Sequence, residues 1–361
     1  APYCRQGGHI VKPARWLLLV TVIGAVAASS CGSPIPTAQD SGVDAGIALA
    51  VGGRGDKGIN DLASGGLDRA KQRLGVDISL LTLNQRGEQR SEGLARFARA
   101  GLRPIIAVGD DYTTHVADVA RRYTDTTFAI VDSAQPRGDN ITNLTFAEEQ
   151  GSYLMGVAAA RKSTTARVGF VGGSNDARTR RYQAGFVAGV KSILPGAVID
   201  VRFVATAVTQ PSEASPLGRS SPTAARAIAE QLLQGGADVL YHAAGDSGSG
   251  VFDAVVSARA RGDRSVWAIG SDTDQALVAT APQKEIILTS MIKRSDNAVY
   301  QFVDDYIDGG TKPGVRRFTL ADEGMSIATS GRFLAKYKLL DELQRVQADI
   351  AQGRVVVPST V

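Results

Sequence analysis

The sequence predicts an α/β protein built from two doubly wound parallel sheets. Short apolar segments alternate with helical segments from residue 44 onward, which is typical of parallel strands joined by right-handed crossovers. There are nine such apolar segments in a chain of 361 residues, which fits two sheets better than one. The composition, 43% hydrophobic and 21% charged, is that of a folded protein and excludes a largely disordered chain.

The segment before the first expected strand has the pattern of a secretory signal. Cations without acids precede the apolar run Trp16–Ala28, thirteen residues long. A transmembrane helix needs about 20 apolar residues, whereas a signal-peptide core needs fewer. Small residues then lead to Cys31. This short segment resembles the lipobox of bacterial lipoproteins, in which the cysteine is lipidated. A plain signal peptide, cut at a nearby small residue, is the alternative.

The cysteine count favours the lipidated form. Only Cys4 and Cys31 occur, and cleavage at Cys31 would leave one cysteine that cannot form an internal disulfide. We therefore expect residues 1–31 to be a lipoprotein signal peptide and Cys31 to carry the anchor. The Pro-, Ser- and Gly-rich residues 32–43 are expected to form a flexible tether. The protein would then lie on the extracytoplasmic face of the cell membrane, held by its lipid.

The strands and helices of the body follow from apolar runs and helical periodicity. We expect strands at 45–51, 76–83, 104–108, 127–132, 167–171, 199–205, 237–243, 265–270 and 285–291. We expect helices at 59–74, 89–100, 112–123, 147–162, 178–192, 222–235, 248–260, 294–308 and 331–352. The polar stretch 206–221 is expected to be a long loop.

The charge balance excludes a nucleic-acid-binding protein. The formal net charge is +4, and three of the cations lie in the leader, so a formal charge of +1 remains for the rest of the chain. Nucleic-acid affinity rests on many contacts between phosphates and Lys or Arg, which a near-neutral body does not supply.

Charged and polar residues follow the expected strands, where ligands of open α/β sheets bind. The acids are Asp56, Asp110, Asp111, Asp132, Asp246, Asp272 and Asp274, and the cations are Lys57 and Lys293. Together they predict a polar, hydroxyl-rich ligand. Each Asp alone could instead cap a helix.

Two motifs suggest enzymes but lack the partners that the chemistry needs. Gly53–Gly58 matches the dinucleotide pattern G-x-G-x-x-G, yet Asp77 starts the next strand instead of ending it. Gly245–Gly248 reads GDSG, but none of the three histidines is placed to act as a base for a serine nucleophile. Metal-ligand spacing is also missing from the sequence. We therefore expect neither catalytic residues nor a cofactor.

A series of short motifs is spread in order over nearly all of residues 45–358, namely Asp56–Asn60, Phe128–Asp132, Phe146–Gly156, Val168–Gly173, Gly185–Gly189, Gly236–Leu240, Ile269–Gln275, Leu288–Lys293 and Gly353–Pro358. These segments resemble motifs of the basic membrane protein family, which includes the purine nucleoside receptor lipoproteins of ABC transporters. Any one of these segments is weak alone, but their ordered agreement is specific.

The resemblance implies two Rossmann-like lobes joined by a hinge, similar to type I periplasmic binding proteins, that close on a nucleoside. The expected boundaries are 44–146 with 275–310 for the first lobe, and 147–274 with 311–361 for the second.

The resemblance also implies roles for single residues. Asp272 would accept hydrogen bonds from ribose hydroxyls, Lys293 would donate to the sugar, and the backbone of Gly245 would border the ribose. Asn60 and Asp132 would face the edge of the base. The complete expected ligand site is Asp56, Lys57, Asn60, Asp110, Tyr112, Asp132, Tyr182, Gly245, Asp272 and Lys293.

The side of the site that holds the base departs from the family pattern. The family's first stacking aromatic corresponds to Ile59, and the loop 206–221, which supplies the second, contains no aromatic residue. Tyr112 and Tyr182 are the candidates to replace them. Aliphatic packing on the base, or a ribosyl ligand other than a purine nucleoside, are the alternatives.

The function expected from these residues is that of a lipid-anchored receptor that delivers a nucleoside to the permease and ATPase of an ABC importer. An envelope enzyme that processes nucleosides, built on the same scaffold, is one alternative. A sensory receptor that docks on a membrane signalling protein is another.

Overall fold

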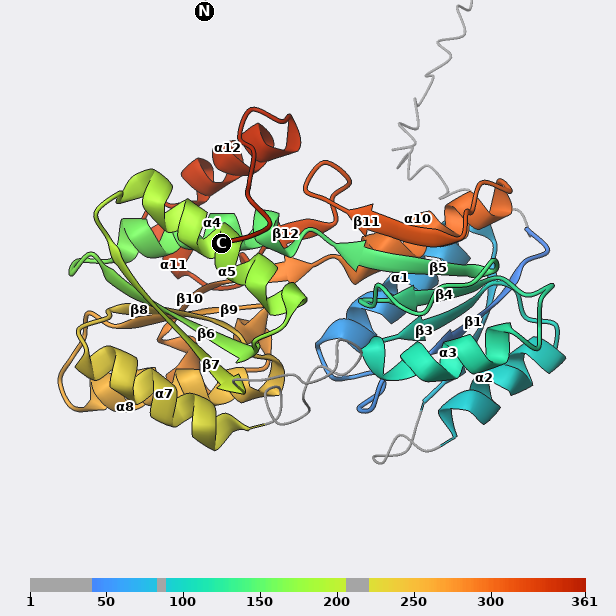
Figure 1. Cartoon of the computed structure of the whole chain (residues 1–361), viewed down its shortest axis with the longest axis horizontal. Coiled ribbons are helices and arrows are strands. Elements are labelled where there is room, and N and C mark those ends of the chain that lie inside the picture. The colour runs from blue at the N-terminus through green and yellow to red at the C-terminus, as the bar shows by residue number, and fades with distance from the viewer. Residues whose placement is uncertain (1–40, 83–88, 206–220) are drawn as a thin grey trace, which may run out of the picture. The chain divides into compact units, whose positions relative to one another are not determined.

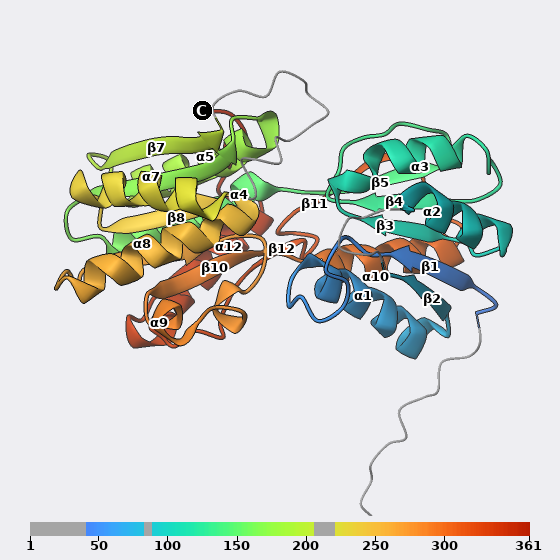
Figure 2. The same cartoon turned by 90° about the horizontal axis from the view of Figure 1, so that it is seen from below.

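Two six-stranded sheets form the body of the computed structural model, which describes residues 41–82, 89–205 and 221–361. The first sheet has the strand order β11-β5-β4-β3-β1-β2 and the second has the order β12-β10-β9-β8-β6-β7. All pairs are parallel except that of β10 with β12 (Figures 1 and 2). The α/β fold class expected from the sequence is thereby confirmed.

The first sheet is covered by helices on both faces. Its strands are β1 Asp44–Ala48, β2 Asp77–Leu81, β3 Ile105–Val108, β4 Phe128–Val131, β5 Ile141–Phe146 and β11 Gly314–Phe318. Its helices are α1 Ile59–Leu74 and α10 Ser295–Ile307 on one face, and α2 Arg90–Arg99 and α3 Thr113–Ala120 on the other (Figure 1). Apolar side chains of the central strands are fully buried on both faces, as in other parallel sheets.

The second sheet has the same layered plan. Its strands are β6 Arg167–Ser174, β7 Val198–Ala205, β8 Val239–Ala243, β9 Trp267–Gly270, β10 Ile287–Lys293 and β12 Met325–Ile327. Helices α4 Glu148–Lys162 and α5 Ala177–Ile193 cover one face, and α7 Pro222–Gln234 and α8 Gly248–Ala260 cover the other (Figure 1). The short α9 Ala281–Lys284, α11 Phe333–Lys336 and the terminal α12 Leu340–Ala351 complete this part.

The strand pairing differs from the expected lobe boundaries at two segments. We placed 275–310 in the first lobe, but β10 pairs with β9 in the second sheet. We placed 311–361 in the second lobe, but β11 pairs with β5 in the first sheet. The reason is that the chain passes between the sheets three times, after β5, after β10 and after β11, whereas strand patterns alone do not show which sheet a strand joins.

Three strands and one short helix were not predicted, and one expected helix is two. Strands β5, β11 and β12 and helix α9 were missed, and the terminal helix expected at 331–352 is divided into α11 and α12. Lys338 lies between these helices with a left-handed backbone, φ 56°, which interrupts the helical hydrogen bonding. Most of the polar stretch 206–221 lies outside the residues that the structure describes.

Candidate functional site

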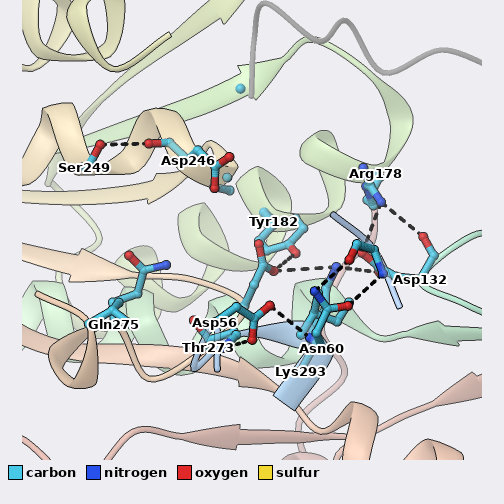
Figure 3. Close-up of a pocket in the computed structure, with 18 of the residues that line it drawn as sticks. Asp56, Asn60, Asp132, Arg178, Tyr182, Asp246, Ser249, Thr273, Gln275 and Lys293 are labelled. Carbon is cyan, nitrogen blue, oxygen red and sulfur yellow. Dashed lines mark hydrogen bonds and ion pairs between the residues drawn. The ribbon is translucent and has the colours of Figure 1, made fainter. Parts of the chain in front are cut away.

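A cavity of about 620 Å³ lies where the strands of both sheets end. Its wall contains residues at or just after the ends of β1, β4, β6, β8, β9 and β10, so it has the position expected for a ligand site in open α/β sheets. Figure 3 shows the polar side chains that point toward one another there. Eight of the ten expected site residues line it, namely Asp56, Lys57, Asn60, Asp132, Tyr182, Gly245, Asp272 and Lys293.

Asp56 and Asn60 organise the loop between β1 and α1. The carboxylate of Asp56 accepts from the backbone N–H groups of Gly58 (2.7 Å) and Asn60 (3.3 Å), which lie at the start of α1. The side-chain amide of Asn60 accepts from the Ala50 N–H at 2.8 Å and donates to the Ala50 carbonyl at 3.3 Å. Asp56 therefore satisfies orphan N–H groups at the start of α1, whereas Asn60 ties the start of this helix to the backbone after β1.

Asp132 and Asp272 occupy equivalent places in the two sheets. Asp132 comes directly after β4, and Asp272 is separated from β9 by Ser271. Both have left-handed backbones, with φ values of 65° and 68°. This conformation is uncommon for a residue with a side chain, and such strained residues cluster at functional sites. The backbone thus aims a carboxylate into the cavity from each sheet.

Lys293 is the buried cation between these two acids. Its side chain is 3% exposed, and its Nζ lies 2.7 Å from Asp132 Oδ1, 3.6 Å from Asp272 Oδ1 and 3.7 Å from Glu148 Oε1. Burial lowers the pKa of Lys293, but the three neighbouring carboxylates outweigh burial, so the pKa lies above its usual value. The ammonium group is therefore charged at neutral pH.

Tyr182 connects α5 to the same cluster. Its phenol donates a short hydrogen bond to Asp272 Oδ1, and its ring lies 5.3 Å from Lys293 Nζ. Burial and the carboxylates around it raise the pKa of Tyr182 well above the ordinary value for tyrosine. The hydroxyl thus remains protonated and is a donor to Asp272 at neutral pH.

Arg178 is a site residue that we did not predict. It lies in the first turn of α5, lines the cavity, and reaches Asp132 and Asp110 beyond the ends of β4 and β3 in the first sheet. Burial lowers the pKa of Arg178, but Asp132 and Asp110 outweigh burial, so the pKa is raised well above its usual value. The sequence has three arginines at the start of α5, and only the orientation of the helix shows that Arg178 is the one that lines the cavity.

Glu148 is the second residue that the sequence analysis missed. It is the first residue of α4, its side chain is 2% exposed, and it accepts from Arg181 Nε at 2.8 Å. A charged side chain this buried needs a partner, and Arg181 and Lys293 supply it. The sequence holds no signal that separates Glu148 from Glu149, because only the fold shows that Glu148 turns toward Lys293 and Glu149 toward Arg317.

The expectation for Tyr112 is wrong, and that for Asp110 needs correction. Tyr112 is fully buried in the core between β1, α2 and α3, and its hydroxyl donates to the Leu49 carbonyl at 2.9 Å. It does not line the cavity, so it cannot replace a stacking aromatic there. Asp110 does not line it either, but contacts Arg178 Nη2 at 3.2 Å and so supports a residue that does.

Gly245 and its neighbours form the cavity wall beyond β8. Gly245 has a φ of 52°, in the left-handed region that glycine adopts without strain. The adjacent Asp246 lines the cavity, and its carbonyl accepts from the Ser249 hydroxyl at 2.9 Å. Backbone groups and an exposed carboxylate are therefore available to a ligand at this end.

No group of three or more His, Cys, Asp or Glu side chains in the ranges 41–82, 89–205 and 221–361 could hold a metal ion. Across the same part of the chain no helix is both long and apolar enough to cross a membrane. Cys31 lies outside the residues that the structure describes.

Residues 45–360 match the model of the Bmp family, described as ABC transporter substrate-binding proteins similar to PnrA. The chain belongs to this family. Its body is thus that of an ABC transporter substrate-binding protein, as the motifs in the sequence imply, and the resemblance to the basic membrane proteins is confirmed.

Two curated relatives illustrate the family. The ABC transporter nucleoside-binding protein BmpA of Lactococcus lactis subsp. cremoris is 28% identical over 268 residues, which cover 72% of each chain. An uncharacterised lipoprotein of Pyrococcus abyssi is 30% identical over 317 residues, which cover 86% of this chain and 74% of the relative.

A solved structure agrees with the fold. The crystal structure of an ABC transporter solute-binding protein from Aeropyrum pernix K1 superposes with a TM-score of 0.67 at 25% identity, covering 88% of this chain and 94% of that one. The Bmp chain therefore has the two-sheet fold of the solute-binding proteins, of the type I class.

Proposed function

We propose that this Bmp-family chain binds a nucleoside in the cavity and delivers it to the permease and ATPase of an ABC importer. The observation that carries the proposal is the pair Asp272 and Lys293 in one cavity wall, with Nζ and Oδ1 3.6 Å apart. A carboxylate beside an ammonium group suits the neighbouring hydroxyls of a ribose, because hydrogen bonds to charged groups are the stronger ones.

The accessibility of Asp272 supports its role toward a ligand. Its side chain is 36% exposed, whereas that of Asp132 is 17% exposed and that of Glu148 is 2% exposed. Tyr182 already donates to Oδ1 of Asp272, which orients the carboxylate. Asp272 is therefore the acid best placed to accept hydrogen bonds from the 2′- and 3′-hydroxyls of a ribose.

The size of the cavity fits this ligand class. Pockets for small molecules usually measure about 300–1,000 Å³, and this one is about 620 Å³. Val51, Ile59 and Val278 add apolar surface to the same wall. These aliphatic side chains would pack on the base in place of the aromatic residues that the sequence lacks.

A thermal-unfolding assay with a panel of five nucleosides tests the proposal. A ligand at about 100 times its Kd stabilises the folded chain by about 2.7 kcal/mol, which raises the melting temperature measurably. We expect such a shift with at least one nucleoside and none with free ribose 5-phosphate. Recovery of the intact nucleoside supports a receptor, whereas release of free base or ribose would favour an enzyme.

We also propose that a lipid on Cys31 holds the protein at the extracytoplasmic face of the cell membrane. The apolar run before Cys31 and the name of the Pyrococcus relative as a lipoprotein support this. Cells that express the chain and are fed radiolabelled palmitate should label it, and Cys31→Ala should abolish the label. Continued labelling of Cys31→Ala would refute the anchor without affecting the nucleoside proposal.

A further inference from the structure

Four ion-pair contacts join five charged side chains into a row that begins in the cavity wall and ends at Asp110 behind it. Lys293 Nζ lies 3.6 Å from Asp272 and 2.7 Å from Asp132. Arg178 then lies 3.3 Å from Asp132 and 3.2 Å from Asp110. Figure 3 shows Lys293, Asp132 and Arg178 following one another in this order. We call these five residues the charged row.

The order of the charged row matches the layout of a nucleoside. Under the proposed function, on which this inference rests, the ribose lies at Asp272 and Lys293. The base extends from the ribose in one direction, and the next two members of the row are Asp132 and Arg178. An acceptor and a planar donor therefore stand next to each other where the edge of the base would lie.

Arg178 has two donors that remain available to a ligand. A guanidinium has five N–H groups. Nη1 donates to the carbonyl and to Oδ2 of Asp132 at 3.2 and 3.3 Å, and Nη2 donates to Asp110 at 3.2 Å. Within the described ranges of the chain, Nε and the second Nη2 hydrogen have no hydrogen-bond partner. The side chain is 23% exposed.

These two donors fit a pair of neighbouring acceptors. Nε–H and a hydrogen of one terminal nitrogen point along the same edge of the guanidinium plane, and such an edge binds two adjacent acceptors at once. Because Asp132 and Asp110 hold the opposite groups of Arg178, the edge has a fixed direction. A ligand group that offers only one acceptor, or a donor, would leave at least one N–H of this edge of Arg178 without a partner.

We propose that Arg178 selects nucleosides of 6-oxopurines, guanosine and inosine, by donating to O6 and N7 of the base. Arginine recognises this acceptor pair of guanine elsewhere. The N1–H beside O6 faces Asp132, the neighbouring acceptor in the charged row. Adenine carries an amino group in place of O6, which would set a donor against the donors of Arg178, so adenosine binds more weakly.

Calorimetric titration with guanosine and 7-deazaguanosine tests this assignment on the unaltered chain. The deaza analogue lacks only the N7 acceptor, and we expect its Kd to be at least about tenfold higher, because a hydrogen bond to a charged donor is lost. Inosine should likewise bind at least about tenfold more tightly than adenosine.

Arg178→Lys makes the test specific to this side chain. Lysine keeps the positive charge next to Asp132 but has no planar edge with two donors. The ratio of the Kd of 7-deazaguanosine to that of guanosine should therefore fall to within about twofold of one. The matched control is Arg180→Lys on the same helix, because Arg180 contacts Asn175 and not the charged row; there the ratio should stay as in the parent chain.

Each result decides between the two proposals. Equal affinity for guanosine and 7-deazaguanosine, or preference for adenosine or for cytidine, would overturn the role of Arg178 but leave nucleoside binding standing. Failure to bind any nucleoside would overturn the proposed function itself. If Arg178→Lys does not fold, the comparison of guanosine with 7-deazaguanosine on the unaltered chain still tests the role of Arg178.

Discussion

At the residue scale, the cavity is organised by charges that are paired before any ligand arrives. Lys293 contacts acids from both sheets, Asp132 and Asp272, and each of these acids has a left-handed backbone. A buried ammonium group without such partners would carry a large desolvation cost. The same pairs that keep Lys293 charged also hold the two carboxylates in place for a ligand.

His242 makes the stability of the fold depend on pH. It is fully buried beside Phe252. Burial lowers the pKa of His242 to about 4, while the Asp272 charge and the side chain of Gln275 oppose this shift. The unfolded chain, with an ordinary pKa near 6.5, takes up a proton first as the pH falls. The free energy of unfolding therefore decreases from pH 6.5 to pH 4.

We predict that the free energy of unfolding falls by about 3 kcal/mol through His242 alone as the pH is lowered from 6.5 to 4. Each unit of difference between the folded and unfolded pKa corresponds to about 1.4 kcal/mol. His242→Leu should remove most of that part of the pH dependence, measured by urea unfolding at both pH values. In His115→Leu, which changes a less buried histidine, most of the dependence should remain. The same slope in His242→Leu as in the parent chain would contradict this prediction.

Ile59 offers a test of where the base lies. Because Ile59 lines the cavity at the start of α1, a ring at this position would face a base held next to it. Stacking on an aromatic side chain contributes about 1–3 kcal/mol per base. Ile59→Phe should therefore tighten nucleoside binding at least about fivefold in calorimetry, whereas Ile59→Leu should not. A loss of affinity in Ile59→Phe would place the base elsewhere.

Much of the site could be predicted at this scale, because polar residues that follow buried strands meet at one sheet edge. That rule identified Asp132, Asp272 and Lys293. It could not identify Arg178 or Glu148, which begin helices, since the sequence does not show which face of α5 or α4 turns to the cavity. The prediction for Tyr112 was wrong because an aromatic residue after a strand can equally point into the core.

At the scale of elements, glycines allow three pairs of helices to pack closely. A Cβ on Gly185 of α5 would lie 1.9 Å from a carbonyl of α4, and one on Gly250 of α8 would lie 1.9 Å from a carbonyl of α7. In α1, a Cβ on Gly66 would lie 2.3 Å from the carbonyl oxygen of Asp296 in α10. Backbone atoms cannot move aside as flexible side chains do, so the helices would have to separate.

Neighbouring glycines of α1 provide a matched pair of variants. Gly66→Ala should destabilise the chain by about 1–3 kcal/mol through overpacking against α10. Gly65→Ala, where nothing lies within 4 Å of the added Cβ, should stabilise it by about 0.5–1 kcal/mol, because alanine favours the helix. Urea unfolding measures both. Equal effects of the two substitutions would show that α1 and α10 do not pack as closely as described.

The elements that the sequence analysis missed lack continuous apolar runs. Strand β5 contains Thr142 and Asn143, whose side chains are buried and donate to the carbonyls of Lys312 and Ser133. Strand β11 contains two arginines that make ion pairs with Asp305 and Glu149. Hydropathy cannot mark such strands, because hydrogen bonds compensate for the burial of the polar residues of β5, and β11 is an edge strand whose arginines are partly exposed.

At the scale of the whole molecule, ion pairs join residues attached to different sheets. Arg178 of α5 contacts Asp132 after β4, and Arg317 of β11 contacts Glu149 of α4. Lys293, at the end of β10, contacts Asp132 as well. The assignment of β10 and β11 could not be predicted, since the chain crosses from one sheet to the other between them and the strand pattern does not show where it crosses. The fold class and the family, by contrast, could be inferred from the alternation and from the ordered motifs.

In the proposed function, the hydroxyls of a ribose bind to Asp272 and Lys293. The most direct measurement is calorimetric titration of the chain with inosine and with 2′,3′-dideoxyinosine, which differ only in those hydroxyls. We predict that the dideoxy compound binds at least about 100-fold more weakly, because two hydrogen bonds to charged groups are lost, and that Asp272→Asn removes most of this difference. Equal affinity for the two compounds would contradict the account.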